Sequence, residues 1–124
     1  MINCLFVGVG GFVGSILRYL LGQIPLQNAG GFPIMTLLIN FIGAFAIGIL
    51  SEFSAKSGAV SPHLLLLLQV GLCGGFTTFS TFSLETWELF DSGKVLFGAI
   101  YITLSVTLCV GAVVIGKFAV KAIA

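Results

Sequence analysis

The sequence has very little charge and few of the residue types that soluble enzymes use in catalysis. Of its 124 residues only 7% are charged, histidine occurs once, and the five basic and four acidic residues are scattered along the chain. No basic patch exists for a nucleic acid, and no soluble macromolecular partner is expected. Cys4, Cys73 and Cys109 lie far apart in apolar segments and match no disulfide or metal-ligand spacing, so we expect small packing residues.

No enzymatic motif in the chain is complete. The glycine-rich stretch 8–14 (GVGGFVG) has Val13 in the third glycine position of a dinucleotide-binding motif, and no strand is expected before it. The sequence also lacks a phosphate loop, a pair of carboxylates in a plausible cleft and a Ser, His, Asp constellation. We therefore expect a protein that is not an enzyme.

Hydrophobic residues are what the chain has in abundance. They make up 58% of it, and the mean hydropathy is +1.21, which is too apolar for a soluble domain to cover itself with polar surface. A bilayer core of ~30 Å takes about 20 residues per helix, so the length accommodates four spans with short connections. The sequence predicts an all-α, multi-pass integral membrane protein with a single domain over residues 1–124.

The four spans are predicted at residues 4–24, 33–53, 63–90 and 94–117. Pro25 closes the first span, a turn follows over 26–32, and Pro33 suits the first turn of the second helix. The start of the chain lacks the basic region of a signal peptide, so we expect the first span to remain in the mature protein.

The distribution of basic residues gives the spans only a weak preferred orientation. Lys56, Lys117 and Lys121 are expected on one side of the membrane, opposite Lys94 and Arg18. Three against two is a small bias under the positive-inside rule, so the chain is expected to insert both ways and to pair as an antiparallel dimer. The alternative is a chain with a single orientation.

Small residues mark faces on which helices pack closely. Gly10 and Gly14 stand four apart in the first span, and Asn40, Ala44 and Gly48 form one stripe on the second. Such stripes indicate assembly and do not by themselves indicate an activity.

The most informative stretch is 71–83 (GLCGGFTTFSTFS), which places adjacent glycines and five hydroxyl residues inside a hydrophobic span. Irregular backbone at membrane depth is tolerated only where it is buried in protein or lines a cavity. We predict a helix break at Gly74–Gly75 that frees backbone groups for contact with an ion. The alternative is an unbroken helix whose Ser and Thr side chains bond back to the preceding turn.

Phe79 and Phe82 are three residues apart, lie on one helix face and flank Ser80 and Thr81. The edge of a phenyl ring is electropositive. Paired ring edges beside hydroxyl donors would coordinate a small anion without a full positive charge that traps it. The alternative is that both rings are apolar filler, as most phenylalanines in membrane spans are.

Three other polar side chains are expected inside the spans. Asn40, near the middle of the second, would donate either to an anion or to another helix. Arg18 and Glu85 would reach toward the membrane surface or pair with each other. Neither belongs to a recognisable proton relay, and the single histidine, His63, lies at a span end.

The fourth span carries one mildly polar track. Tyr101, Ser105 and Cys109 are spaced at i, i+4 and i+8 and therefore share a face. Thr103 and Thr107 fall on another face and compete for the same role.

Three stretches resemble the Fluc fluoride channels, a family also called CrcB proteins. They are 10–19 (GGFVGSILRY), 36–43 (TLLINFIG) and 74–82 (GGFTTFSTF), and the third is the specific one. The match follows the first three spans in order and spacing, whereas the fourth matches only through its polar track. The resemblance implies an antiparallel, dual-topology homodimer in the cell membrane, with two narrow pores that pass fluoride passively and selectively and protect microbes from it.

The resemblance also implies roles for individual residues. The fluoride pore would be lined by Phe79, Phe82, Asn40, Ser80, Thr81, Tyr101 and Ser105. Arg18 matches the family's vestibule arginine and Glu85 its acid after the rings. Cys109 stands where some members have serine, so a contact with fluoride is not carried over to it.

A structural sodium ion is implied at the dimer interface, held by backbone carbonyls of Gly74 and Thr77 from both subunits, with no organic cofactor. Fluoride is small and tightly hydrated, so a pore must replace its water with several directed donors. The expected partners are fluoride, a second copy of the chain and membrane lipid.

Two other functions are compatible with four short spans. A proton-coupled multidrug exporter would need a carboxylate in the first span, which has none. An assembly subunit without transport activity would explain the glycine stripes but not the hydroxyl-rich stretch.

Overall fold

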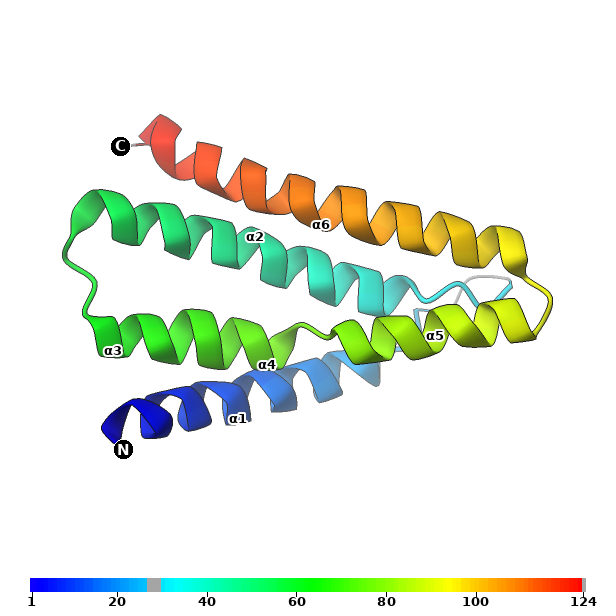
Figure 1. The fold of residues 1–124 in the computed structure, drawn as a ribbon, viewed down its shortest axis with the longest axis horizontal. Helices are drawn as coiled ribbons and strands as arrows, with labels where there is room; N and C mark the ends of the chain where they lie inside the picture. The colour runs from blue at the N-terminus through cyan, green and yellow to red at the C-terminus, as the bar shows by residue number, and fades with distance from the viewer. Residues whose placement is uncertain (27–29, 124) are drawn as a thin grey trace.

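The computed structural model describes residues 1–26 and 30–123, and all of its regular structure is helical within those ranges. The chain passes four times along the molecule (Figure 1). The passages are α1 (Ile2–Gly22), α2 (Ile34–Ser57), a third passage over Pro62–Asp91, and α6 (Val95–Ile123). Each is long and apolar enough to cross a membrane. The four-span prediction is confirmed, although part of the predicted turn at 26–32 lies outside the described residues.

The third passage consists of four pieces: α3 (Pro62–Leu65), η1 (Leu66–Cys73), α4 (Gly74–Phe76) and α5 (Phe79–Asp91). η1 is a π-helix, which the sequence analysis did not predict. Such wide turns are rare and often occur at functional sites. The predicted interruption of this span is confirmed, and it separates α4 from α5.

Local signals explain most helix ends. Gly58 ends α2 in the left-handed conformation at φ 58°, and Ser61 Oγ accepts a hydrogen bond from the Leu64 N–H to cap α3. Pro33 precedes α2 instead of lying in its first turn. α6 continues beyond the predicted end at 117, to Ile123, because no helix breaker follows.

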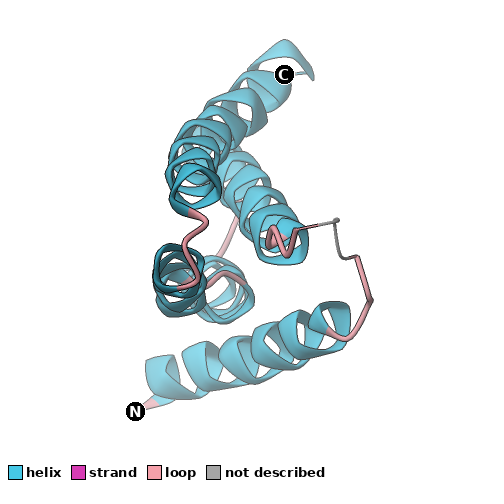
Figure 2. Ribbon diagram, turned by 90° about the vertical axis from the view of Figure 1, so that its right-hand side faces the viewer, coloured by secondary structure: helices cyan, strands magenta, loops and turns pink. Residues whose placement is uncertain are grey.

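The four passages pack as two pairs (Figures 1 and 2). α2 packs against α6, and α1 packs against η1 and α4. The two chain ends and the α2–α3 connection lie at the same end of the molecule. This arrangement agrees with the predicted placement of Lys56, Lys117 and Lys121, the last two of which approach Glu52 at 3.9 and 4.0 Å.

Glycines allow the close contacts within each pair, as the small-residue stripes predicted. A Cβ added at Gly10 or Gly14 on α1 would overlap the carbonyl oxygen of Leu67 or Leu72. On the other pair, a Cβ at Gly48 would overlap the Val113 carbonyl. Backbones therefore touch directly at these positions.

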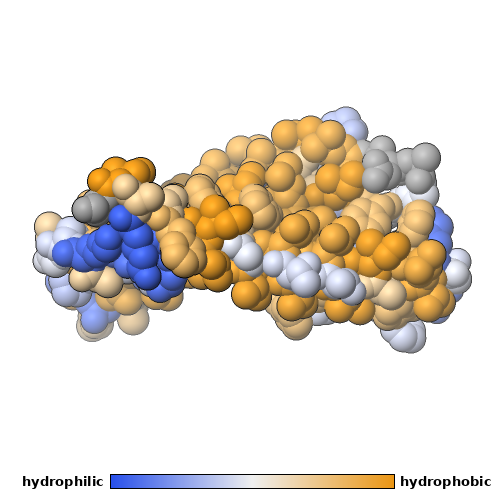
Figure 3. Space-filling view, turned by 90° about the horizontal axis from the view of Figure 1, so that it is seen from above, coloured by the Kyte–Doolittle hydropathy of each residue, from blue (hydrophilic) through white to orange (hydrophobic). Residues whose placement is uncertain are grey.

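The buried core is small, and most large apolar side chains lie on the outside. The core cluster consists of Phe82, Leu89 and Tyr101, which are packed against residues of α2 and α6. Figure 3 shows hydrophobic residues over most of one face, with the most hydrophilic colour toward the two ends. An apolar exterior of this kind is stable in lipid, and the chain is a multi-pass membrane protein.

Candidate functional site at the break in the third span

The helical backbone of the third passage is interrupted at Thr77 and Thr78. Both have extended dihedral angles, with ψ 158° at Thr77 and φ −150°, ψ 121° at Thr78. The prediction of a break at Gly74–Gly75 was wrong by three residues, because both glycines are in helix α4. β-branched residues such as threonine favour extended backbone. Gly75 instead allows close helix packing, because an added Cβ would lie 2.7 Å from the Gly11 carbonyl oxygen.

Thr78 begins α5 and organises its first turn. Its Oγ1 accepts from the Thr81 N–H at 3.2 Å, donates to Thr81 Oγ1 at 3.1 Å and lies 3.3 Å from Ser80 Oγ. This is the usual role of threonine at the first position before a helix. The hydroxyls predicted beside the rings are therefore linked to one another through Thr78.

Asn40 on α2 contacts the backbone of Thr78 with both ends of its amide. The Thr78 N–H donates to Asn40 Oδ1 at 2.8 Å, and Asn40 Nδ2 donates to the Thr78 carbonyl at 3.0 Å. Of the two roles predicted for Asn40, the structure contains the interhelical hydrogen bond. One N–H of the amide is left over, because an asparagine has two such donors.

The break deprives several backbone carbonyls of their ordinary helical donors, and those of Gly74 and Thr77 are among them. In an uninterrupted helix the Thr78 N–H would bond to the Gly74 carbonyl, and the Thr81 N–H to the Thr77 carbonyl. Here these donors are directed to Asn40 Oδ1 and to Thr78 Oγ1. The oxygens of Gly74 and Thr77 are thus left without those bonds, and both residues line a cavity.

This cavity, which we call the ring-lined cavity, has a volume of about 420 Å³. Phe79 and Phe82 face it with ring centroids 5.4 Å apart. Ser105 is 8% exposed, and its Oγ is buried without a hydrogen-bond partner in the structure. The other lining residues include Asn40, Gly43, Ala44, Gly74, Thr77, Thr78 and Cys109. The cavity therefore brings together most of the predicted pore residues, and no charged side chain is among its lining residues in the described part of the chain.

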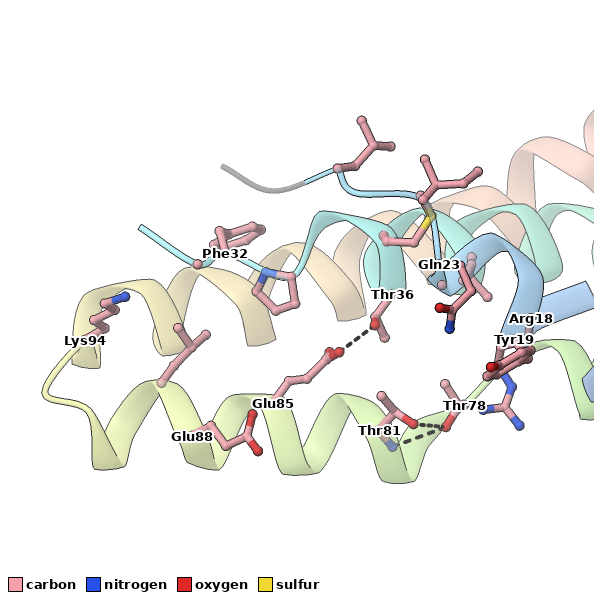
Figure 4. Close-up of a pocket in the computed structure, with 18 of the residues that line it drawn as sticks. Arg18, Tyr19, Gln23, Phe32, Thr36, Thr78, Thr81, Glu85, Glu88 and Lys94 are labelled. Carbon is pink, nitrogen blue, oxygen red and sulfur yellow. Dashed lines mark hydrogen bonds between the residues drawn. The ribbon is translucent and has the colours of Figure 1, made fainter. Parts of the chain in front are cut away.

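A second cavity of about 910 Å³, which we call the charged cavity, opens on the other side of Thr78. Arg18, Glu85, Glu88 and Lys94 line it, together with Thr81 (Figure 4). This wide, charged space holds Arg18, which the resemblance assigns to a vestibule, and Glu85, which it matches to the acid after the rings.

Arg18 and Glu85 do not pair with each other. Arg18 Nε donates to the Gly75 carbonyl at 3.0 Å, which ties α1 to α4 just before the break. Glu85 accepts from Thr36 Oγ1 at 2.7 Å and from the Tyr101 hydroxyl at 2.6 Å (Figure 4 draws the first of these bonds). The carboxylate therefore joins α2, α5 and α6.

The members of the predicted polar track lie in different surroundings. Tyr101 is 0% exposed, donates to Glu85 and lines neither cavity, whereas Ser105 and Cys109 line the ring-lined cavity. The competing Thr103 and Thr107 are exposed and donate to carbonyls of their own helix. The structure contains all three cysteines as free thiols.

Sequence reasoning missed two residues of the site. Thr36 holds Glu85, and Thr78 is the centre of the hydrogen bonds at the break. Thr36 stands four residues before Asn40 and so shares its helix face, which was a usable signal. Thr78 precedes a helix that carries Thr81 and could have been recognised as a cap.

The fold and the site define a class: small multi-pass membrane proteins in which a broken helix presents neutral donors and backbone carbonyls inside the membrane. The chain belongs to the CrcB family, because the family described as "CrcB-like protein, Camphor Resistance (CrcB)" matches residues 5–117.

Curated relatives match the chain along its length. A protein of Ruminiclostridium cellulolyticum, named "Fluoride-specific ion channel FluC", is 48% identical over 125 residues, which cover 100% of this chain and 96% of the relative. A protein of Rhizobium johnstonii with the same name is 45% identical, with 100% of both chains covered. A third so named, from Chlorobaculum tepidum, is 44% identical over 82% of this chain and 81% of its own length.

Proposed function

We propose that this chain is a subunit of a fluoride-selective ion channel that lets fluoride leave the cell passively and so limits its toxicity. Full-length relatives that bear the name of a fluoride-specific channel support the proposal. The observation that carries it is the ring-lined cavity, where the unpartnered hydroxyl of Ser105 lies beside the rings of Phe79 and Phe82. A buried hydroxyl without a partner in the chain has a hydrogen bond to give, and a bound anion would accept it.

The donors of the ring-lined cavity suit a small anion. Ring edges at Phe79 and Phe82, the remaining N–H of Asn40 and the hydroxyl of Ser105 are all neutral. Several directed donors replace the water of fluoride, and the absence of a fixed positive charge from the lining allows the ion to leave. The hydroxyl of Thr81, which lines the charged cavity, would act at the entrance, and that of Ser80 would contribute through Thr78, to which it is linked.

The charged cavity would collect the ion from water. Arg18 and Lys94 would attract an anion at their own positions, while Glu85 and Glu88 balance their charge over the cavity as a whole. Glu85 would stay bonded to Thr36 and Tyr101 and hold the wall between the two cavities.

A homodimer with inverted subunits would complete the site. Phe79 is 79% exposed in the single chain although it lines the ring-lined cavity, so a second copy would cover it. The weak asymmetry in lysine and arginine placement allows both orientations in the membrane. Membrane lipid would cover the remaining apolar surface.

The carbonyls left free at the break fit a sodium ion between the subunits. Oxygens of Gly74 and Thr77 from two copies would hold it, since hard monovalent cations bind carbonyl oxygens and Gly74 is exposed on the single chain. The ion would supply positive potential and join the two broken helices.

Efflux from liposomes tests the activity. Vesicles that contain the purified protein are expected to release fluoride without a proton gradient and to retain chloride. A proton-coupled exporter would need such a gradient, and α1 carries no acidic residue to support one. Strict dependence on a proton gradient would contradict the channel, and no flux at all would favour an assembly subunit.

Cysteine labelling tests the inverted dimer separately. Ala59→Cys in the exposed α2–α3 connection, on a Cys4→Ser background, places a reactive thiol at one end of the molecule. We expect an impermeant reagent to modify part of the population from each side. Labelling from one side only would refute dual topology and leave the activity standing.

A further inference from the structure

Asn40 does more at the break than line a cavity. Its amide accepts from the N–H of Thr78 and donates to the carbonyl of the same residue, at 2.8 and 3.0 Å. A side-chain amide that pairs with both backbone groups of one residue replaces the partners which that residue lacks outside a helix. The backbone N–H and carbonyl of the extended Thr78 thus find their hydrogen-bond partners on α2.

We propose that Asn40 is a positioning residue that holds the third span open at Thr77–Thr78 and so keeps the Gly74 carbonyl available to a cation; the last clause rests on the proposed function. The Thr78 N–H is the donor that an unbroken helix would give to Gly74. Because that N–H is engaged by Asn40, the Gly74 oxygen remains unpaired with it. One side chain thus takes the donor that the Gly74 carbonyl would have in an unbroken helix.

The same pair of bonds sets the position of the rings. Thr78 caps α5 through the Thr81 N–H, and Phe79 follows it directly. Displacing Thr78 would move the first turn of α5 and, with it, Phe79 and Phe82. Asn40 therefore couples the cation-binding carbonyls to the anion-binding rings, although it belongs to neither group.

The extended backbone at Thr77–Thr78 should not persist without its hydrogen bonds to Asn40. An unpaired backbone N–H inside a membrane is costly, so in the absence of Asn40 the Thr78 N–H returns to Gly74 and the helix closes. Closure would turn Thr77 and Thr78 from extended to helical.

The backbone prediction is testable by nuclear magnetic resonance on the protein in lipid bilayers. The ¹³Cα and ¹³Cβ chemical shifts of Thr77 and Thr78 should have extended values in the wild type and move toward helical values in Asn40→Ala. Ser105→Ala is the matched control, because it removes another polar group from the same cavity without touching the Thr78 backbone. Its threonine shifts should stay at the wild-type values.

Sodium response is the second readout. The sodium concentration at half-maximal thermal stabilisation should rise roughly tenfold or more in Asn40→Ala, as is typical when a group that orients metal ligands is lost. Ser105→Ala should keep the wild-type value even where its fluoride flux falls. Asn40→Asp keeps the acceptor for the Thr78 N–H, so its chemical shifts and its sodium midpoint should lie between those of wild type and Asn40→Ala. If Asn40→Ala does not fold, Asn40→Asp replaces it as the test variant.

Each alternative has its own result. Unchanged Thr77 and Thr78 shifts in Asn40→Ala, with reduced fluoride flux, would overturn the positioning role and leave Asn40 as a donor to the anion. Changed shifts with an unchanged sodium midpoint would overturn the link to the cation. If the wild type transports no fluoride but the Thr77 and Thr78 shifts change as expected in Asn40→Ala, the proposed function is refuted and the positioning role of Asn40 stands.

Discussion

The two cavities on either side of Thr78 differ in the charge of the side chains that line them. The charged cavity is the larger, at about 910 Å³, and has arginine, lysine and glutamate in its wall. The ring-lined cavity has less than half that volume, about 420 Å³, and its wall combines phenyl rings and aliphatic side chains with small residues, hydroxyls and one amide. The same helix, α5, contributes residues to both.

Solvent explains the difference. A charge in a wide, wet space acts over a distance at little desolvation cost, and it serves to attract an ion. In a narrow apolar space a full charge would interact so strongly that a counter-ion could not leave, so neutral donors are better suited to conduction. Substitutions in the ring-lined cavity should therefore change fluoride flux strongly and independently of salt, whereas removing a positive charge from the charged cavity should change flux weakly and in a salt-dependent way.

The largest effect is expected at the rings. Phe79→Ile and Phe82→Ile keep these positions apolar but remove the electropositive edge, so fluoride efflux should slow by about two orders of magnitude, or ~3 kcal/mol. The measurement is efflux from liposomes after dimer assembly has been confirmed. Phe6→Ile is the control, because the Phe6 ring packs beside His63 and lines neither cavity. Wild-type flux in either ring variant would show that this ring only packs.

The wall between the cavities is the next place to test. Glu85→Ala removes the acceptor of two hydrogen bonds and leaves the Tyr101 hydroxyl buried without a partner, so the free energy of unfolding should fall by about 3 kcal/mol. Reversible denaturant titration of the purified protein measures this. Glu88→Ala, an exposed residue of the charged cavity, should change the free energy by less than about 0.5 kcal/mol. Equal losses in both would mean that Glu85 has no special structural role.

The sequence was sufficient for the architecture because lipid imposes simple constraints. Long apolar segments must be helices, and the number and approximate positions of the passages followed from that, although α6 is longer than predicted. The pairing of helices was partly readable too, since Gly10 and Gly14 on α1 do allow backbone contact. Position along the chain was less certain: glycine was taken as the helix breaker, whereas Thr77 and Thr78 break the helix and Gly75 packs.

The site was less readable, because its contacts join residues far apart in the sequence. The spacing of Phe79 and Phe82 predicted a shared face, which is confirmed by their ring separation. No local pattern could show that Asn40 reaches Thr78, 38 residues away, or that Tyr101 turns away from Ser105 to bond Glu85. Helical spacing predicts a common face but not which neighbour each side chain meets.

A moderate effect is expected for Ser105→Ala, which should raise stability and lower fluoride flux. Its Oγ is buried without a partner, so Ser105→Ala should raise the free energy of unfolding by about 1 kcal/mol. Loss of a donor should slow fluoride efflux about tenfold. Both quantities can be measured on one preparation. A variant that loses stability would show that the hydroxyl has a structural partner in the assembled channel.

The smallest effect is expected in the charged cavity. Lys94 is exposed, lines this cavity and donates through Nζ to the Gly30 carbonyl at 2.6 Å. Lys94→Gln removes the charge and keeps an N–H donor for that carbonyl, so any change in flux reports electrostatics. At low ionic strength efflux should fall about twofold. At 1 M salt, where the Debye length is ~3 Å, the difference from wild type should vanish.

Lys56→Gln is the matched control for that experiment, because Lys56 is also exposed and lines neither cavity. It removes the same net charge from the chain and should leave efflux unchanged at both salt concentrations. Flux measured across a salt series in both variants therefore separates local attraction from a general effect of charge. A salt-independent loss in Lys94→Gln would mean that the lysine acts through its bond to Gly30, and the contrast between the charged cavity and the neutral one would then rest on the ring variants alone.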